Sequence, residues 1–117
     1  MSIFNRKKDF KEIEPKEAFT ILEKHRHDSS YIPLDVRNPK EYEEGHIENA
    51  EFLNVNSPNF EEELDKLDKN KTYYVYCKSG MRSVKAVKLM KKHGFNEIYN
   101  MIGGIEKWKS KRLPIEK

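Results

Sequence analysis

Cysteine is nearly absent: Cys77 is the only one among 117 residues. One cysteine cannot form an intramolecular disulfide, and an unpaired thiol is unusual in a secreted domain. It also cannot build a thiolate zinc cluster, and the four histidines are too scattered along the chain to predict a metal site. We therefore expect a cytoplasmic protein with no metal and no other cofactor.

Long hydrophobic runs are also missing. The longest apolar and aromatic stretch covers residues 73–77, and no apolar segment follows the basic residues near the N-terminus. We expect neither a membrane span nor a signal peptide. Residues 1–8 are predicted to form an N-terminal tail ahead of one domain over residues 9–117, a usual length for a single domain.

An excess of charge of one sign is lacking too. The chain has 23 basic and 20 acidic side chains, so its formal net charge is only +3 although 37% of its residues are charged. Such interspersed charges do not resemble the dense basic face of a nucleic-acid-binding protein. Leu, Ile, Val and Phe supply 27 residues, about 23% of the chain and above the roughly 20% below which a chain fails to fold.

Prolines are few, and three of them mark predicted helix starts. Pro15 begins a helix over 15–24, and Pro58 begins another over 58–68. Between them, Asn38 and Glu41 flank Pro39 in the pattern of a capping box, which predicts a short helix that ends at Gly45. The apolar spacing over 82–93 predicts a longer amphipathic helix.

The strand candidates lie between these helices, at 31–36, 52–55, 73–77 and 96–101. Strands that alternate with helices predict a parallel sheet. The segment 73–77 carries no charge and suits a central strand covered on both faces. Pro33 conflicts with a central position, because proline cannot donate a hydrogen bond to a neighbouring strand. We therefore expect Pro33 at an edge or at the start of its strand.

The loop after the predicted central strand is the segment that most clearly indicates a reactive or ligand-binding site. Its residues are Cys77, Lys78, Ser79, Gly80, Met81 and Arg82. Loops at the carboxyl edge of a parallel sheet bind ligands, and their N–H groups, with the positive end of the next helix, can hold an anion. We expect this environment and the cations Lys78 and Arg82 to lower the pKa of Cys77 and make it a nucleophile. The alternative is a small, buried, inert cysteine.

Four separated motifs occur along the chain. They are Leu34-Asp35-Val36-Arg37, the segment 41–47 with Ala50, Cys77-Lys-Ser-Gly80-Met-Arg82-Ser83, and the segment 101–105 with Trp108. In this order and spacing they resemble the single-domain rhodaneses, a family of sulfurtransferases, over residues 10–114. The sequence departs from the family pattern at Glu14, Pro33 and Asn49, all outside the loop that follows the central strand.

This resemblance implies an α/β fold: an open parallel sheet of about five strands with helices on both faces, its fifth strand near residues 10–13. It implies that Cys77 accepts sulfur from a small anionic donor such as thiosulfate and passes it, as a persulfide, to cyanide, a thiol or a protein acceptor. The donor-binding loop would comprise the substrate-binding residues Lys78, Ser79, Gly80, Met81 and Arg82. No nucleic acid and no membrane is expected as a partner.

Two other functions compete with catalysis of sulfur transfer. One is a non-catalytic or sulfur-carrier rhodanese module that docks on a partner protein. The other is a cysteine-dependent phosphatase or arsenate reductase. The anion-binding loop of such enzymes has five residues between Cys and Arg, whereas here four residues separate Cys77 from Arg82.

Several other polar residues are expected to be structural. We expect Arg37 to pair with Glu41 over the first turn of the second helix, with a charged pair of Asp35 and Arg37 at the strand end as the alternative. We expect His46 to hold its loop by hydrogen bonds, and Gly103-Gly104 to form a tight turn before a short helix whose Trp108 lies in the core. The lysine-rich segment 107–112 is expected to be a solvated helix face, with a docking patch for an acidic partner as the alternative.

Overall fold

The computed structural model describes residues 10–117, and five parallel strands form its main sheet in the order β1-β6-β5-β2-β4. The tail expected over residues 1–8 lies outside the described residues, and the domain boundary stays a prediction. The strands are β1 (Lys11–Ile13), β2 (Tyr31–Asp35), β4 (Glu51–Phe52), β5 (Thr72–Tyr76) and β6 (Glu97–Met101). The predicted parallel sheet, including its short fifth strand, is therefore confirmed.

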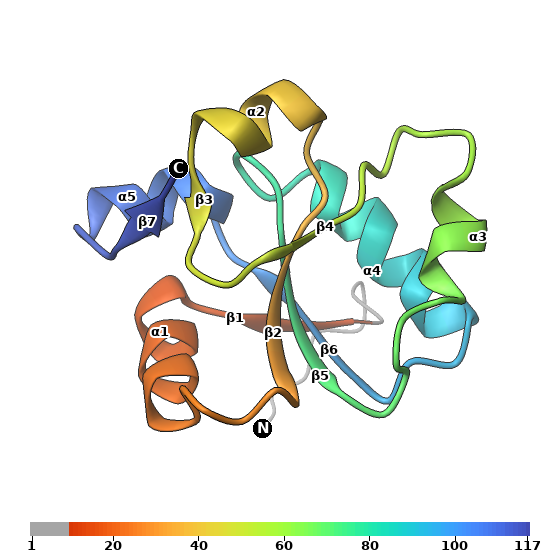
Figure 1. Ribbon diagram of the computed structural model, residues 1–117, viewed down its shortest axis with the longest axis horizontal. Coiled ribbons are helices and arrows are strands. Elements are labelled where there is room, and N and C mark those ends of the chain that lie inside the picture. Colours follow the sequence, from red (N-terminus) through yellow and green to blue (C-terminus); the bar gives the residue numbers. More distant parts are fainter. Residues whose placement is uncertain (1–9) are drawn as a thin grey trace.

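Helices cover both faces of this sheet, as expected (Figure 1). They are α1 (Pro15–Lys24), α2 (Pro39–Glu44), α3 (Phe60–Leu64), α4 (Arg82–Lys92) and α5 (Gly104–Ser110). Residues of α3 and α4 pack in one apolar cluster, whereas residues of α1 and α5 pack in a second. Successive residues of a strand point to opposite faces, so β5 sends Tyr73 and Val75 into the first cluster and Tyr74 and Tyr76 into the second. Cys77, which follows β5 directly, continues the alternation into the first cluster.

Local sequence signals account for the helix boundaries. Proline is the first residue of α1 and of α2, and both halves of the capping box between Asn38 and Glu41 are formed. The third helix is shorter than the predicted 58–68. Turns lie on either side of it, closed by Phe60 N to Ser57 O and by Leu67 N to Leu64 O, and the second of these brings Leu67 against the core without helical geometry.

Pro33 lies within β2, between β5 and β4, yet its missing N–H removes no strand pairing. Ser30 O accepts a hydrogen bond from Thr72, and Val36 N donates one to Tyr76. Since backbone groups alternate in direction along a strand, these even-numbered residues face β5 and Pro33 faces the opposite side. There the pairing with β4 begins only at Leu34, so β2 is locally an edge at Pro33, as expected.

A second, two-stranded sheet was not predicted. It pairs β3 (His46–Ile47) with β7 (Ile115–Glu116) in antiparallel fashion and brings the C-terminal segment beside α2. In the described part of the chain, no helix combines the length and the apolar character needed to cross a membrane.

Candidate active site

Cys77 follows the last residue of β5 directly, at the carboxyl edge of the central strand. The predicted strand thus ends one residue early, and Cys77 is the first residue of the loop that leads into α4. Its side chain is only 1% exposed. The backbone N–H of Gly80 donates a hydrogen bond to Cys77 Sγ over 3.1 Å, and the Ser83 hydroxyl lies 3.4 Å from the same sulfur.

Two opposing effects determine the pKa of the Cys77 thiol: burial of the sulfur and hydrogen bonding to it. Burial of the sulfur raises the pKa, whereas the Ser83 hydroxyl and the backbone N–H groups of Ser83, Gly80 and Ser79 lower it, and the net direction is downward. A thiolate has no proton to donate, so it needs several converging donors of this kind. The loop supplies them in a small space around one sulfur atom.

Backbone N–H groups at the start of α5 donate hydrogen bonds to two carbonyl groups of the loop. Ile105 N donates to Cys77 O over 2.9 Å, and Glu106 N donates to Lys78 O over 3.0 Å. This close approach requires the glycine turn that was predicted before α5, where Gly103 and Gly104 both have positive φ angles. The loop is therefore fixed at both its carbonyl and its N–H groups.

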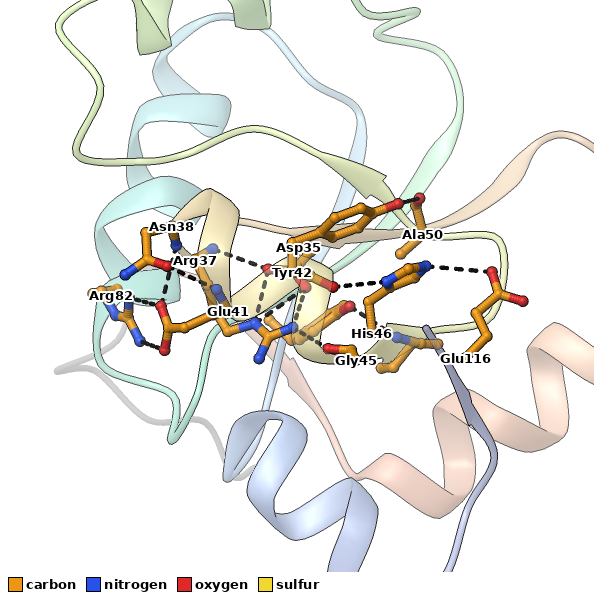
Figure 2. Close-up of polar contacts among 12 residues, drawn as sticks. Asp35, Arg37, Asn38, Glu41, Tyr42, Gly45, His46, Ala50, Arg82 and Glu116 are labelled. Atoms are coloured by element: carbon orange, nitrogen blue, oxygen red, sulfur yellow. Dashed lines mark hydrogen bonds and ion pairs between the residues drawn. The ribbon is translucent and has the colours of Figure 1, made fainter.

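Arg82, the first residue of α4, is held by α2. Its guanidinium donates to both carboxylate oxygens of Glu41, over 2.8 and 3.0 Å (Figure 2). The pKa of Glu41 is lowered to about 2, chiefly by these hydrogen bonds, with a further contribution from the backbone N–H of Asn38. Arg82 was expected to help lower the pKa of Cys77, but it is paired with a carboxylate, and the groups that lower this pKa are hydrogen-bond donors of Ser83, Gly80 and Ser79.

The expected pair of Arg37 with Glu41 is wrong. Arg37 instead donates to both carboxylate oxygens of Asp35, with Nη2 to Oδ2 at 2.7 Å, and also to the Gly45 carbonyl. Asp35 ends β2 and Arg37 lies two residues further on, so both reach the same buried region below α2. Glu41 faces Arg82 across the gap to α4, which leaves Asp35 as the carboxylate nearest to Arg37 (Figure 2).

His46 holds its loop by hydrogen bonding, as expected. Its Nδ1 lies 2.9 Å from the Tyr42 carbonyl, and its ring stacks on the Tyr42 ring with centroids 3.9 Å apart. Its Nε2 lies 3.4 Å from a carboxylate oxygen of Glu116 in β7 (Figure 2). His46 therefore links α2 to the C-terminal strand. The prediction for Trp108 also holds, since its side chain is 1% exposed.

The structure brings only part of the predicted loop onto the sulfur. Ser79 and Gly80 contribute backbone N–H groups, whereas the side chains of Lys78 and Met81 are exposed, Met81 by 80%. Sequence reasoning left Ser83 out of the site. Its position in the first turn of α4, on the buried and otherwise apolar face of that helix, is the signal that could have identified it.

An α/β domain with a buried thiol, ringed by amide donors at the carboxyl edge of its central parallel strand, defines a class of protein with a nucleophilic or anion-stabilised cysteine. Among the described residues no group of His, Cys, Asp and Glu converges as a metal site. Comparison with known proteins narrows the class further.

A sequence model described as "Rhodanese-like domain" matches residues 18–111. Thiosulfate sulfurtransferase GlpE of Coxiella burnetii is 36% identical over 101 residues, which cover 86% of this chain and 89% of that protein. The crystal structure of a rhodanese-related protein from Thermoplasma volcanium has a TM-score of 0.77 at 29% identity, covering 92% of this chain and 98% of that one. A rhodanese-like domain protein from Staphylococcus aureus has a TM-score of 0.70 at 29% identity, covering 85% and 91%.

The chain belongs to the rhodanese-like domain family. The resemblance seen in the sequence and the α/β fold that it implied are both confirmed. Membership of this family, with a single-domain relative of nearly the same extent, supports sulfurtransferase activity in general, which requires a sulfur donor and a sulfur acceptor.

Proposed function

We propose that the chain is a thiosulfate-type sulfurtransferase in which Cys77 carries the transferred sulfur as a persulfide. The observation that carries this proposal is the ring of donors around Cys77 Sγ, led by Gly80 N at 3.1 Å. Such donors stabilise a sulfur anion and require no acid or base in the same loop. A thiolate held in this way is a nucleophile ready at neutral pH.

The reaction balances as two displacements. In the first, the Cys77 thiolate attacks the outer sulfur of thiosulfate; the new Sγ–S bond forms, the sulfur–sulfur bond of thiosulfate breaks, and its electron pair leaves with sulfite. In the second, cyanide or a thiolate attacks the outer sulfur of the persulfide, and the Cys77 thiolate is released. Lys78, Ser79, Gly80, Met81 and Arg82 are the proposed donor-binding residues, of which Ser79 and Gly80 act through their N–H groups.

The test is the mass of the intact protein after incubation with thiosulfate. We expect a gain of one sulfur atom, its removal by cyanide, and no gain in the Cys77→Ser variant, because a serine hydroxyl is not ionised near neutral pH. Since Cys77 is the only cysteine, any sulfur that stays on the Ser variant would overturn the proposal. A cytoplasmic location is proposed with it, because a reactive thiolate is preserved best where thiols stay reduced.

A sulfur-carrier role toward a protein acceptor is the second candidate. It is favoured by Met81, which is 80% exposed although it lies in the loop that surrounds the thiol. An exposed methionine is a common contact at adaptable protein interfaces. Rapid turnover with cyanide favours the enzyme, whereas stable loading followed by slow release to every small acceptor favours the carrier.

A further inference from the structure

Positive charge is concentrated in one part of the chain. The stretch 69–96 contains eight lysine and arginine side chains and no aspartate or glutamate, whereas the remainder of the chain has more acidic than basic residues. This stretch includes β5, the loop around Cys77 and α4. The small overall net charge of +3 therefore conceals a local excess of positive charge on the elements that carry the thiol.

The outer face of α4 carries a line of exposed side chains. The buried face of this helix consists of Ser83, Ala86, Val87 and Met90. On the opposite side, Met81, Lys85, Lys88 and Lys92 are exposed and follow one another at intervals of four, three and four residues. Residues at this spacing lie on one side of a helix, and at about 1.5 Å per residue the line is about 16 Å long. We call these four residues the α4 ridge.

The three lysines of the α4 ridge differ from the cations next to the thiol. Arg82 forms an ion pair with Glu41, and Lys78 lies 3.9 Å from a carboxylate oxygen of Glu106. In the part of the chain that the structure describes, none of the ridge lysines forms an ion pair. A solvated helix face usually mixes acidic and basic residues in i,i+4 pairs, but α4 has no acidic residue. Its charge is therefore available to a surface of opposite sign.

The α4 ridge begins beside the sulfur. Met81 directly follows Gly80, whose N–H donates to Cys77 Sγ over 3.1 Å. From this loop α4 runs towards α3 (Figure 1). A partner that lies along the ridge therefore has one end next to the loop that surrounds the thiol. The exposed thioether of Met81 offers this end an adaptable apolar contact.

Carboxylates at the far end of α4 restrict what can lie along the ridge. His93, which follows the last residue of α4, lies 2.8 Å from a carboxylate oxygen of Glu61 and 3.0 Å from one of Asp65. A nucleic acid carries a phosphate at every nucleotide, so a strand that continues along α4 beyond Lys92 meets these acidic groups. A folded protein with a bounded acidic patch can end before them. The arrangement of charge thus favours a protein partner.

We propose that the α4 ridge is the docking surface for a protein that accepts the sulfur, and that this protein carries an acidic patch beside a cysteine thiol. The inference rests on the proposed function and adds the surface that binds its acceptor. In the transfer, the partner's sulfur bonds to the outer sulfur of the anionic Cys77 persulfide, the Sγ–S bond breaks, and its electron pair stays on Cys77 as the thiolate. The proton of the partner's thiol moves to the transferred sulfur.

The experiment offers two peptide thiols to the protein after its Cys77 has been loaded from thiosulfate. One peptide is a cysteine followed by six glutamates, and the other is a cysteine followed by six glutamines. An extended chain spans about 3.3 Å per residue, so both are long enough to follow the ridge. The preference is the ratio of the rate constants for sulfur loss from Cys77 to the two peptides, followed by intact-protein mass.

The test variant changes Lys85, Lys88 and Lys92 together to glutamine. We expect the preference for the acidic peptide to be about fivefold larger in the wild-type protein than in this variant at low salt, because the ridge lysines attract the glutamates. The two thiols differ in intrinsic reactivity, but this difference cancels when one preference is compared between two proteins. An equal preference in both proteins overturns the inference.

A second triple variant is the matched control. It changes Lys16, Lys109 and Lys111 to glutamine, which makes the same change in net charge at exposed positions on α1 and at the end of α5. These helices pack on the other face of the sheet, so the control should keep the wild-type preference. Loss of the preference in both variants shows an effect of net charge alone and overturns the inference.

A measurement on the wild-type protein covers the case in which the test variant fails to fold. The preference should fall towards that of the uncharged contact as salt rises to about 0.5 M, because exposed charges are screened. A preference that salt leaves unchanged overturns the inference. A labelled single strand of DNA with six phosphates tests the other class of partner: if it binds more tightly than the acidic peptide, and through the ridge lysines, the surface belongs to nucleic acid.

Loading from thiosulfate separates this inference from the proposed function. Both triple variants should load sulfur on Cys77 within about twofold of the wild-type rate, because the changed lysines lie outside the loop 77–82. Normal loading without a preference for the acidic peptide leaves the proposed function intact and removes only the docking surface. Failure of the wild-type protein to load sulfur removes both.

Discussion

Gly104 lies directly beneath the carbonyl of Cys77: a Cβ atom placed on it would come within 2.5 Å of Cys77 O and Lys78 O. Its φ angle of +60° is one that residues with side chains rarely adopt. The neighbouring Ile105 N–H donates to the Cys77 carbonyl. The glycine therefore lets α5 support the loop that surrounds the thiol.

We expect Gly104→Ala to disrupt this support. The methyl group would collide with backbone atoms that can move only if the loop moves, so stability should fall by about 2–4 kcal/mol and sulfur loading should slow more than tenfold. Gly94→Ala is the matched control, because Gly94 also has a positive φ, +89°, but nothing lies within 4 Å of its added Cβ. Its cost should be about 1 kcal/mol with unchanged loading. Urea unfolding and intact-protein mass measure the two effects.

Ser83→Ala should raise the pKa of the Cys77 thiol. The serine hydroxyl is one of the groups that lower this pKa against the opposing effect of burial, so its removal should move the inflection of iodoacetamide alkylation to higher pH. Ser110→Ala removes a hydroxyl that donates to Lys107 O on an exposed helix end and should leave the profile unchanged. An unshifted inflection in Ser83→Ala contradicts the role assigned to this hydroxyl.

The sequence predicted the elements of this fold better than the contacts between them. Local signals, such as proline at the first position of α1 and the capping box of α2, depend on only a few neighbouring residues. The structure forms both of them where the sequence predicts them. The ribbon of β3 and β7 was missed because each strand has two residues and the pair is far apart in the chain. Strands this short show no periodicity.

In the candidate site, too, the local features could be predicted and the contacts between distant residues could not. Cys77 and the following glycine could be recognised from their place between a buried strand and a helix. The choice of ion-pair partners could not, because Glu41 is 41 residues away from Arg82 and meets it only through the packing of α2 beside α4. The pair of Asp35 with Arg37 was the alternative, but Glu41 was favoured as the partner of Arg37, because the sequence alone does not show that Asp35 and Arg37 are buried together.

Asp35→Asn should be among the most damaging single changes outside the loop. Asp35 is fully buried and Arg37 is only 4% exposed, so loss of the carboxylate leaves a buried guanidinium without its counter-charge, at a cost of about 3–5 kcal/mol. Glu23→Gln breaks the exposed pair of Glu23 with Arg26 and should cost less than about 0.5 kcal/mol. Similar urea midpoints for the two variants would show that the buried pair contributes no more than a surface one.

The ion pair of Glu41 with Arg82 should make stability depend on pH in the acid range. Hydrogen bonds from Arg82 lower the pKa of Glu41 from 4.5 to about 2. A carboxylate with a lowered pKa in the folded state stabilises the protein fully above the pKa of the unfolded state, and this contribution is lost as the pH falls through 4.5 towards 2. Since both side chains retain some exposure, we expect a contribution of about 1 kcal/mol.

The measurement is the difference in free energy of unfolding between the wild-type protein and Glu41→Gln, followed from pH 7 to pH 2. Many carboxylates titrate in this range, but their effects are common to both proteins and cancel in the difference. The difference should be constant above about pH 5, shrink below it, and approach zero near pH 2. For Glu43→Gln, whose carboxylate is exposed on the same helix, the corresponding difference should stay near zero throughout. A Glu41→Gln difference that persists undiminished at pH 2 would show that shape, and not charge, holds Arg82 against α2.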